Sequence, residues 1–316
     1  MKNIKKLFTY LKQSRNIKFF IDISECDVFM KFEGNAEIGI IGGTGADIAL
    51  EDAEDLKIYT PYGKTSEFIN VGYFKGKKVA FLPRHGKGHT IPPHKLNFRA
   101  NIWAMKELGV KCIISPSAVG SLKKELDKGH FLLVDQYIDR TKKRLDTFYE
   151  GGQVCHIGQA EPFCEYLNNL FYESGKQIEG LNILNGGTYV CIEGPRFSTR
   201  AESKTFRQWN ADIIGMTVYP EVVLAAEKEI CYCTIAMITD YDVWAAYCKN
   251  CGIIEYGERC ENCGGSLEKL SVSIEEILDT VRKNEGNLKK LLEMVIPKID
   301  TQRDCGCHHT LTGAVI

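Results

Sequence analysis

Short apolar runs alternate with amphipathic stretches along most of the chain. Five apolar runs have the length and residue types expected of buried strands: 37–41, 78–82, 111–114, 188–192 and 230–238. Two longer stretches carry apolar residues at helical spacing: 97–108 and 273–292. This alternation is typical of an α/β fold, and it predicts a mixed central sheet flanked by helices.

A glycine-rich turn and an arginine–histidine pair follow the first two predicted strands. Residues 39–45 read Gly-Ile-Ile-Gly-Gly-Thr-Gly, and residues 83–86 read Pro-Arg-His-Gly. Backbone N–H groups, a hydroxyl, a guanidinium and an imidazole are suited to bind an anion. A dinucleotide site would need the spacing Gly-x-Gly-x-x-Gly, which these glycines do not match. We expect the candidate polar groups to follow strand ends, where open α/β sheets gather their ligands.

Composition narrows the class of protein. With 316 residues, 44% of them hydrophobic, the chain can bury one large core and carry an appendage. Its formal net charge of -1 gives no general electrostatic reason to bind nucleic acid or a membrane. Polar residues at 12–15 interrupt any apolar stretch long enough for an export signal, and there are thirteen cysteines. We therefore expect a reducing compartment, with the cytoplasm as the default.

Two carboxylates flank a tyrosine after the last predicted strand. In extended geometry Asp240 and Asp242 share a face, so each is expected to raise the pKa of the other. A carboxylic acid held partly neutral in a dry pocket can act as a general acid.

Two Cys-x-x-Cys knuckles separated by eight residues predict a Cys₄ metal site made of Cys248, Cys251, Cys260 and Cys263. Zinc is favoured, although rubredoxin-type iron uses similar knuckles. The basic residues of the surrounding segment are matched by acidic ones, so a nucleic-acid role is not supported: Lys249, Arg259 and Lys269 stand against Glu255, Glu258, Glu261 and Glu268.

The tail Cys305-Gly306-Cys307-His308-His309 has three interpretations. Its thiols and imidazoles can ligate a metal, form a redox or stabilising pair, or have no specific role.

Four motifs in this order resemble the trimeric purine nucleoside phosphorylases, and within them the methylthioadenosine phosphorylase branch. They are the glycine turn, Pro83-Arg84-His85-Gly86, Glu193-Gly194-Pro195-Arg196-Phe197-Ser198 and Thr239-Asp240-Tyr241-Asp242. The resemblance covers roughly residues 37–300, interrupted by a Cys₄ insertion at 245–267. It leaves an N-terminal extension at 1–36 and a Cys-x-Cys tail at 301–316. It implies a phosphorylase/hydrolase-like fold that uses phosphate to cut the N-glycosidic bond of a purine nucleoside.

The resemblance also implies a phosphate site. Its positions fall on Thr44, Arg84, His85, Ser117 and Thr217. The family has threonine where this chain has Ser117, and the exchange keeps the hydroxyl. Arg84 is expected to act as a bidentate donor to the phosphate.

The base and sugar positions implied by the resemblance lie farther along the chain. Asp240 and Asp242 match carboxylates that meet purine N7 and the 6-amino group. The 6-oxopurine branch has asparagine in that place, so Asp240 favours a 6-aminopurine. With His85 these two form the expected catalytic set. The remaining expected substrate-binding residues are Ala118, Phe197, Ser198, Met216, Ile274, Ile277 and His156.

Specific roles follow for four of these residues. Phe197 would pack on the purine, and Ile274 and Ile277 would form an apolar wall for a 5′-methylthio group. His156 would enter the site of a neighbouring subunit, which implies a homotrimer or a dimer of trimers. Two alternatives remain: a phosphorylase of 6-oxopurine nucleosides or methylthioinosine, and a catalytically silent scaffold that carries a zinc-ribbon interaction module.

Overall fold

The computed structural model describes residues 36–316 except 44, 47, 253 and 272. The predicted extension 1–36 therefore lies, apart from Ala36, outside the described residues. No helix of the described part is both long and apolar enough to span a bilayer.

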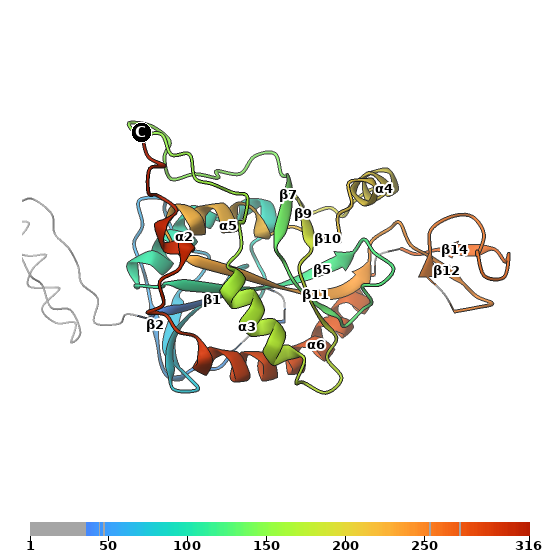
Figure 1. Cartoon of the computed structure of the whole chain (residues 1–316), viewed down its shortest axis with the longest axis horizontal. Helices are drawn as coiled ribbons and strands as arrows, with labels where there is room; N and C mark the ends of the chain where they lie inside the picture. Colours follow the sequence, from blue (N-terminus) through green and yellow to red (C-terminus); the bar gives the residue numbers. More distant parts are fainter. Residues whose placement is uncertain (1–35, 44, 47, 253, 272) are drawn as a thin grey trace, which may run out of the picture.

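A large mixed sheet forms the centre of the molecule (Figure 1). Its strands are β1 (Ile38–Gly42), β2 (Glu51–Leu56), β3 (Ile69–Phe74), β4 (Lys77–Pro83), β5 (Cys112–Ser121), β6 (Phe131–Leu133), β7 (Gln136–Arg140), β8 (Ile183–Asn185), β9 (Thr188–Ile192), β10 (Ile213–Gly215) and β11 (Cys231–Tyr241). The main path runs β2-β3-β4-β1-β5-β10-β9-β7, while β11 pairs with β5 and β6, and β6 pairs with β8. The predicted α/β fold with a mixed central sheet is confirmed.

Strand β5 is the junction of this sheet. Its first residues pair in parallel with β1, its whole length pairs in parallel with β11, and its last residues pair antiparallel with β10. The β5–β11 register shifts between Ile238 and Asp240. This irregularity changes the strand geometry immediately before the two candidate carboxylates.

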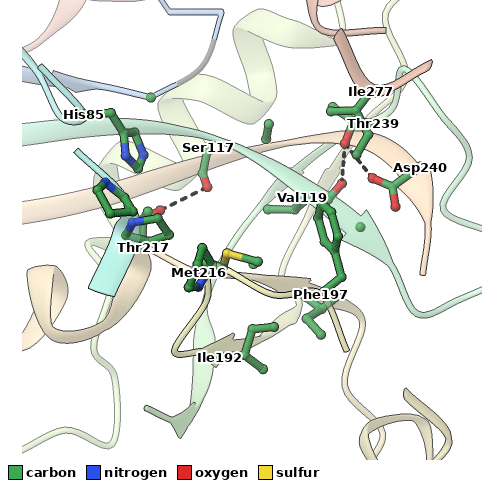
Figure 2. A pocket seen from close by; sticks show the side chains of 18 of the residues that line it. His85, Ser117, Val119, Ile192, Phe197, Met216, Thr217, Thr239, Asp240 and Ile277 are labelled. Carbon is green, nitrogen blue, oxygen red and sulfur yellow. Dashed lines mark hydrogen bonds between the residues drawn. The ribbon is translucent and has the colours of Figure 1, made fainter. Parts of the chain in front are cut away.

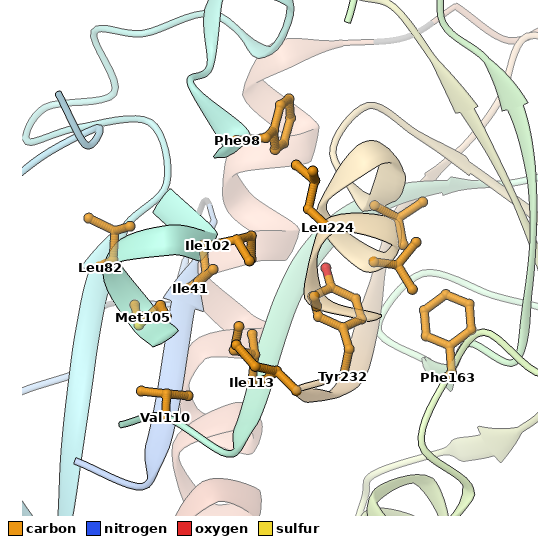
Figure 3. Packing of buried hydrophobic residues seen from close by; sticks show 14 of the residues in the cluster. Ile41, Leu82, Phe98, Ile102, Met105, Val110, Ile113, Phe163, Leu224 and Tyr232 are labelled. Carbon is orange, nitrogen blue, oxygen red and sulfur yellow. The ribbon is translucent and has the colours of Figure 1, made fainter. Parts of the chain in front are cut away.

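Helices cover both faces of the sheet (Figures 1 and 3). On one face α2 (Phe98–Glu107) and α5 (Val218–Glu227) pack in a core that includes Ile102, Met105 and Leu224. On the other face α3 (Glu165–Gly175) and α6 (Ile274–Val295) pack in a second core that includes Phe171 and Leu288. In α2 and α6 the buried face carries apolar residues at the helical spacing that the sequence predicts.

Side-chain caps fix the starts of several helices. Asn97 accepts from the Ala100 amide before α2, and Ser273 accepts from the Glu276 amide before α6. Thr199 and Glu202 form a capping box before α4 (Arg200–Gln208). Three short 3₁₀ turns complete the helical elements of the described part: η1 (Pro93–Lys95), η2 (Ile296–Lys298) and η3 (Gly306–His309).

The cysteine-knuckle segment forms a separate small sheet that extends away from the body (Figure 1). Its strands are β12 (Ala246–Cys248), β13 (Ile254–Glu255) and β14 (Leu267–Lys269), in the order β13-β12-β14. Arg200, the first residue of α4, donates to the carbonyl of Leu270 at 2.9 Å and to that of Val243. The base of the knuckle segment is thereby attached to α4.

One expectation about the strands is wrong. The polar groups Ser117 and Asp240 lie within β5 and β11, and do not follow their ends. The strand predicted at 111–114 continues past its apolar run, because β11 pairs with β5 through Pro116. The polar side chains are tolerated in a buried strand because they line a cavity.

Candidate active site

A cavity of about 430 Å³ lies at the β5–β11 junction. Its walls come from the loop after β4, the second half of β5, the loop before α4, the β10–α5 connection, the end of β11 and the first turn of α6. Figure 2 shows His85, Ser117 and Thr217 toward one end, and Thr239 and Asp240 toward the other. We refer to these as the hydroxyl end and the carboxylate end.

Arg84 lies against the hydroxyl end, and its side chain is 1% exposed. Nε and Nη2 donate to Glu221 at 3.0 and 3.1 Å, and Nη1 donates to the carbonyl of Pro116 at 3.2 Å. Nη2 also donates to the Ile41 carbonyl and to the Ser115 hydroxyl. The prediction that Arg84 donates to phosphate through two nitrogens is therefore wrong, because the guanidinium edge formed by Nε and Nη2 faces Glu221. The second N–H of Nη1 is left to donate to a ligand.

That remaining N–H lies next to the glycine turn. A Cβ added at Gly43 would lie 2.7 Å from Nη1 of Arg84, and both residues line the cavity. A glycine here keeps the backbone close to the guanidinium without blocking it. Arg84 can thus offer one hydrogen bond and its charge to an anion.

His85 has a defined tautomer. Its Nδ1 lies 2.8 Å from the carbonyl of Ile91, which can only accept, so Nδ1 carries the proton and Nε2 is free to accept. Burial, followed by the nearby Arg84 charge, lowers the pKa of His85 to about 4. The ring stacks on His89 with centroids 4.1 Å apart. A neutral imidazole is therefore available to accept a hydrogen bond from a protonated phosphate oxygen.

Ser117 and Thr217 complete the hydroxyl end. Their oxygens are 3.3 Å apart, and the Tyr189 hydroxyl lies 3.4 Å from Ser117 Oγ and accepts from the Thr217 amide. Both side chains are buried and line the cavity. The arrangement provides several rotatable O–H donors in a small, dry space.

Asp240 occupies the carboxylate end. Burial raises its pKa to about 6, the charge of Asp242 adds to this rise, and a hydrogen bond from Thr239 at 2.8 Å opposes it. The expected mutual effect of the two aspartates is present on Asp240, but burial is the larger cause. Near neutral pH this carboxyl can exchange a proton with a ligand.

Asp242 is held in place by a single hydroxyl. Ser198 Oγ lies 2.6 Å from Oδ1 and 2.7 Å from Oδ2, and the Asp242 amide donates to the carbonyl of Ser121. The Asp242 side chain is 3% exposed. Its contact with Ser198 connects the carboxylate end to the loop before α4.

Apolar side chains line the space between the two polar ends. Phe197, Met216 and Ile192 face the cavity in Figure 2, and Ala118 lines it from β5. Phe197 is 44% exposed, so one ring face is available to a planar ligand. Ile277 reaches the cavity from α6.

The structure gathers most of the predicted site residues around one cavity. They are Arg84, His85, Ser117, Ala118, Phe197, Ser198, Met216, Thr217, Asp240, Asp242 and Ile277. Thr44 lies outside the described residues. Ile274 is 66% exposed and does not line the cavity, so its assignment to the 5′ wall is wrong in this chain. The start of α6 is exposed at Ile274, and Ile277, three residues farther along, reaches the cavity.

His156 is also absent from the cavity of its own chain. It is exposed in the loop 150–158, and its amide donates to the carbonyl of Ala314 at 2.8 Å. Its predicted place in a neighbouring site stays a prediction.

Sequence reasoning missed three residues at this site. His89 lines the cavity, Glu221 holds Arg84, and Tyr189 bridges Ser117 and Thr217. The role of Glu221 could have been inferred from the sequence, because a carboxylate among the apolar residues of a helix needs a buried partner. Nothing in the sequence indicated the role of Tyr189, since a tyrosine in an apolar strand usually packs in the core.

The four knuckle sulfurs lie together, as their spacing predicts. The Sγ atoms of Cys248, Cys251, Cys260 and Cys263 are all within 4.8 Å of one another. Both knuckles fold alike: the Gly252 and Gly264 amides donate to the carbonyls of Cys248 and Cys260 at 2.8 Å, and both glycines have positive φ. Four sulfurs in such a group are a suitable ligand set for a tetrahedral metal ion.

Two relatives of this chain carry the name S-methyl-5'-thioadenosine phosphorylase. The chain is 52% identical over 284 residues to the S-methyl-5'-thioadenosine phosphorylase of Nitrosopumilus maritimus, covering 89% of this chain and 99% of the relative. It is 49% identical over 275 residues to that of Pyrococcus abyssi, covering 87% and 97%.

Solved structures give the same result. A methylthioadenosine phosphorylase from an antarctic soil metagenomic library superposes with a TM-score of 0.78 at 39% identity, covering 90% of this chain and 93% of that chain. The Schistosoma mansoni methylthioadenosine phosphorylase in complex with adenine gives 0.73 at 30% identity, covering 89% and 99%. Residues 37–297 match the sequence profile of the phosphorylase superfamily. The chain therefore belongs to the phosphorylase superfamily.

Proposed function

We propose that this protein is a pentosyltransferase that uses inorganic phosphate to cleave S-methyl-5'-thioadenosine into adenine and 5-methylthioribose 1-phosphate. The observation that carries the proposal is the one cavity whose hydroxyl end suits an anion and whose opposite end holds a carboxyl with a pKa of about 6. The relatives named above support the substrate, since their names specify it. The reaction would serve purine and methionine salvage.

Phosphate binds at the hydroxyl end in this proposal. The hydroxyls of Ser117 and Thr217 and the remaining N–H of Arg84 donate to its oxygens, while His85 Nε2 accepts from its O–H. Neutral His85 thereby orients the phosphate and leaves an unprotonated oxygen to attack the anomeric carbon. Thr44 would add a further hydroxyl.

The purine binds at the carboxylate end. Bond cleavage gives the sugar oxocarbenium character and leaves negative charge on the base, which a hydrogen bond or proton from Asp240 to N7 stabilises. The second oxygen of Asp240 and the carboxylate of Asp242, which Ser198 holds, would accept from the exocyclic 6-amino group. Phe197 would pack on the purine face, and the side chain of Met216 would contact the ribose.

The 5′ substituent meets an apolar surface. Ile277 offers no donor to a 5′-hydroxyl, so a methylthio group is preferred there. A 6-oxopurine nucleoside or methylthioinosine would place a carbonyl oxygen against a carboxylate, which is unfavourable unless that carboxylate is protonated.

A direct comparison of four nucleosides tests the proposal. Methylthioadenosine, methylthioinosine, adenosine and inosine are incubated with the full chain at equal phosphate, and base release is followed. Methylthioadenosine should react with the highest kcat/KM, and no nucleoside should react without phosphate. Faster methylthioinosine turnover would favour the 6-oxopurine alternative. Absence of turnover for all four nucleosides would favour the silent scaffold.

We further propose a homotrimer, or a dimer of trimers, in which His156 completes the site of a neighbouring subunit. The exposed position of His156, away from its own cavity, supports this arrangement. The ladder between Val154–His156 and the chain end holds the loop outward, where a second subunit can meet it.

The knuckle cluster is proposed to bind structural zinc. Tetrathiolate coordination without an open position suits zinc in a structural role. Because Arg200 connects the base of this segment to the loop that carries Phe197 and Ser198, the metal would stabilise one side of the cavity from outside. Thirteen cysteines, four of them in the knuckle cluster, favour a reducing compartment such as the cytoplasm.

A further inference from the structure

A second group of four cysteines lies on the far side of the molecule from the knuckles. The Sγ atoms of Cys164, Cys231, Cys305 and Cys307 are all within 4.8 Å of one another. Cys164 immediately precedes α3, Cys231 begins β11, and Cys305 and Cys307 flank the first residue of η3. We propose that these four thiols form a second tetrathiolate zinc site, which fastens the C-terminal tail to the sheet.

The spacing of the sulfurs fits a tetrahedral ion. Zn–S bonds of about 2.3 Å at tetrahedral angles separate the sulfurs by roughly 3.8 Å. Cys164 and Cys305 are 3.9 Å apart, and in the knuckle cluster Cys248 and Cys263 are 3.6 Å apart. Small inward movements of the other sulfurs close the site.

The surroundings are suited to a negatively charged centre. Four thiolates around Zn²⁺ leave two net negative charges, once the four thiol protons have been released to solvent. Nη2 of Arg303 lies 3.1 Å from Cys305 Sγ and donates to it. Hydrogen bonds of this kind from outside the ligand set stabilise bound thiolates.

His308 belongs to this outer shell and is not a ligand. Its Nε2 lies 3.4 Å from Cys231 Sγ and 3.4 Å from the carbonyl of Lys111. A carbonyl can only accept, so Nε2 carries a proton and also donates to the sulfur. The ligand set is therefore four cysteines.

The site is buried and still has a route from solvent. Cys164, Cys231 and Cys305 are at most 8% exposed, while Cys307 is partly exposed. A cavity of about 490 Å³ is lined by Arg303, Cys305 and Cys307, among other residues. Metal can enter through this cavity, and a chelator can reach the site.

The metal would add a second fixed point to the tail, whose last residues bond to the loop around His156. Between η2 and the end of the chain the structure describes only the one turn η3 as regular structure. A metal at the four cysteines joins this segment to β11 and to the start of α3, which lie far away in sequence. The free energy of metal binding at this site would add to the free energy that keeps the tail docked.

The test removes the knuckle site first, so that the second site is counted alone. Full-length Cys248→Ser/Cys251→Ser protein is purified with reductant, and its zinc is measured by elemental analysis. One zinc per chain is expected. Adding Cys307→Ser should remove it, whereas adding Cys155→Ser, which changes a cysteine outside both clusters, should leave it in place. Absence of zinc from the knuckle-free protein would overturn the proposal.

A second measurement covers the case in which the knuckle-free protein does not fold. In the otherwise wild-type chain, Cys307→Ser should lower the zinc content from two to one per chain. Trypsin should then cleave after Arg303 faster than in the wild type. Mass spectrometry of the freshly isolated, unreduced wild type can contradict the proposal. A Cys305–Cys307 or Cys164–Cys231 disulfide would show that these thiols pair with each other and do not bind zinc.

Discussion

Arg84 and Glu221 form a salt bridge through two nitrogens in the interior, with distances of 3.0 and 3.1 Å and no more than 1% exposure of either side chain. Hydroxyls of Tyr232 and Ser115 donate to the same carboxylate at 2.7 and 2.9 Å. The pair joins the end of β4 to α5 beneath the hydroxyl end of the cavity. Arg84 therefore holds the fold together as well as lining the cavity.

Replacing Arg84 should reduce stability as well as activity. Arg84→Ala leaves a buried carboxylate without its counter-ion, which costs roughly 3–5 kcal/mol. Urea denaturation should show this loss, and the double variant Arg84→Met/Glu221→Gln should recover part of it. Arg196→Ala, which breaks an exposed pair with Glu202, is the control and should unfold at the wild-type urea concentration. Equal midpoints for Arg84→Ala and the control would contradict this account.

Asp240 should set the choice of base. In Asp240→Asn an amide can donate to a 6-oxo group where the carboxylate cannot, so activity on methylthioinosine relative to methylthioadenosine should rise. The measurement is the ratio of the two kcat/KM values, which is insensitive to the fraction of active enzyme. A ratio equal to that of the wild type would remove Asp240 from base recognition.

Activity should decline as the pH rises through about 6, where Asp240 loses its proton. The kcat/KM profile of Asp240→Asn should lack this inflection, which separates it from the ionisation of phosphate itself. An identical inflection in both proteins would exclude Asp240 as the proton donor.

The same group links stability to pH. The pKa of Asp240 in the folded protein lies above the ordinary value of 3.8, so its contribution to stability is fully present below about pH 4 and is lost as the pH rises through about 6. Asp240→Asn should thus gain stability relative to the wild type between these values. His85 contributes with the opposite sign, since its folded pKa is lowered to about 4, but this contribution is common to both proteins and cancels in the comparison.

Loss of the knuckle metal should act locally. Cys251→Ser should lose one zinc per chain, and protease should then cut within 245–267, because a site of this kind supplies local folding energy. Phosphate binding should persist, since the hydroxyl end has no contact with this segment among the described residues. Protection of 245–267 equal to that of the wild type would argue against a structural metal there.

Mixed oligomers should reveal whether His156 acts across a subunit boundary. Asp240→Ala and His156→Ala proteins are each expected to be nearly inactive alone. Unfolded together and refolded, they should regain part of the activity, because some sites then receive both native groups. Mixed trimers that form and stay inactive would show that His156 acts within its own subunit or has no catalytic role.

Local pattern was enough for most elements and for much of the site. The strand Thr188–Ile192 has the predicted bounds, and the predicted helices differ from α2 and α6 by one to three residues. Apolar spacing determines such elements because each must bury one face. The motifs that carry Arg84, His85 and Asp240 converge on one cavity, although they are far apart in sequence.

What could not be predicted depends on contacts between distant segments. The orientation of the Arg84 guanidinium depends on Glu221, which lies 137 residues away. Ile274 and Ile277 share a helical stripe, and only their position relative to the sheet decides which one reaches the cavity. The tail cysteines meet Cys164 and Cys231 through the fold alone, and no sequence spacing connects them.

Residues 314–316 support the loop around His156. Val154 and Ile316 exchange backbone hydrogen bonds at 3.2 and 2.9 Å, and the His156 amide donates to the carbonyl of Ala314. These bonds join segments that lie far apart in the sequence. The position of the His156 loop therefore depends on the docking of residues 314–316, and loosening that segment would move the loop while the sheet and the cavity stay intact.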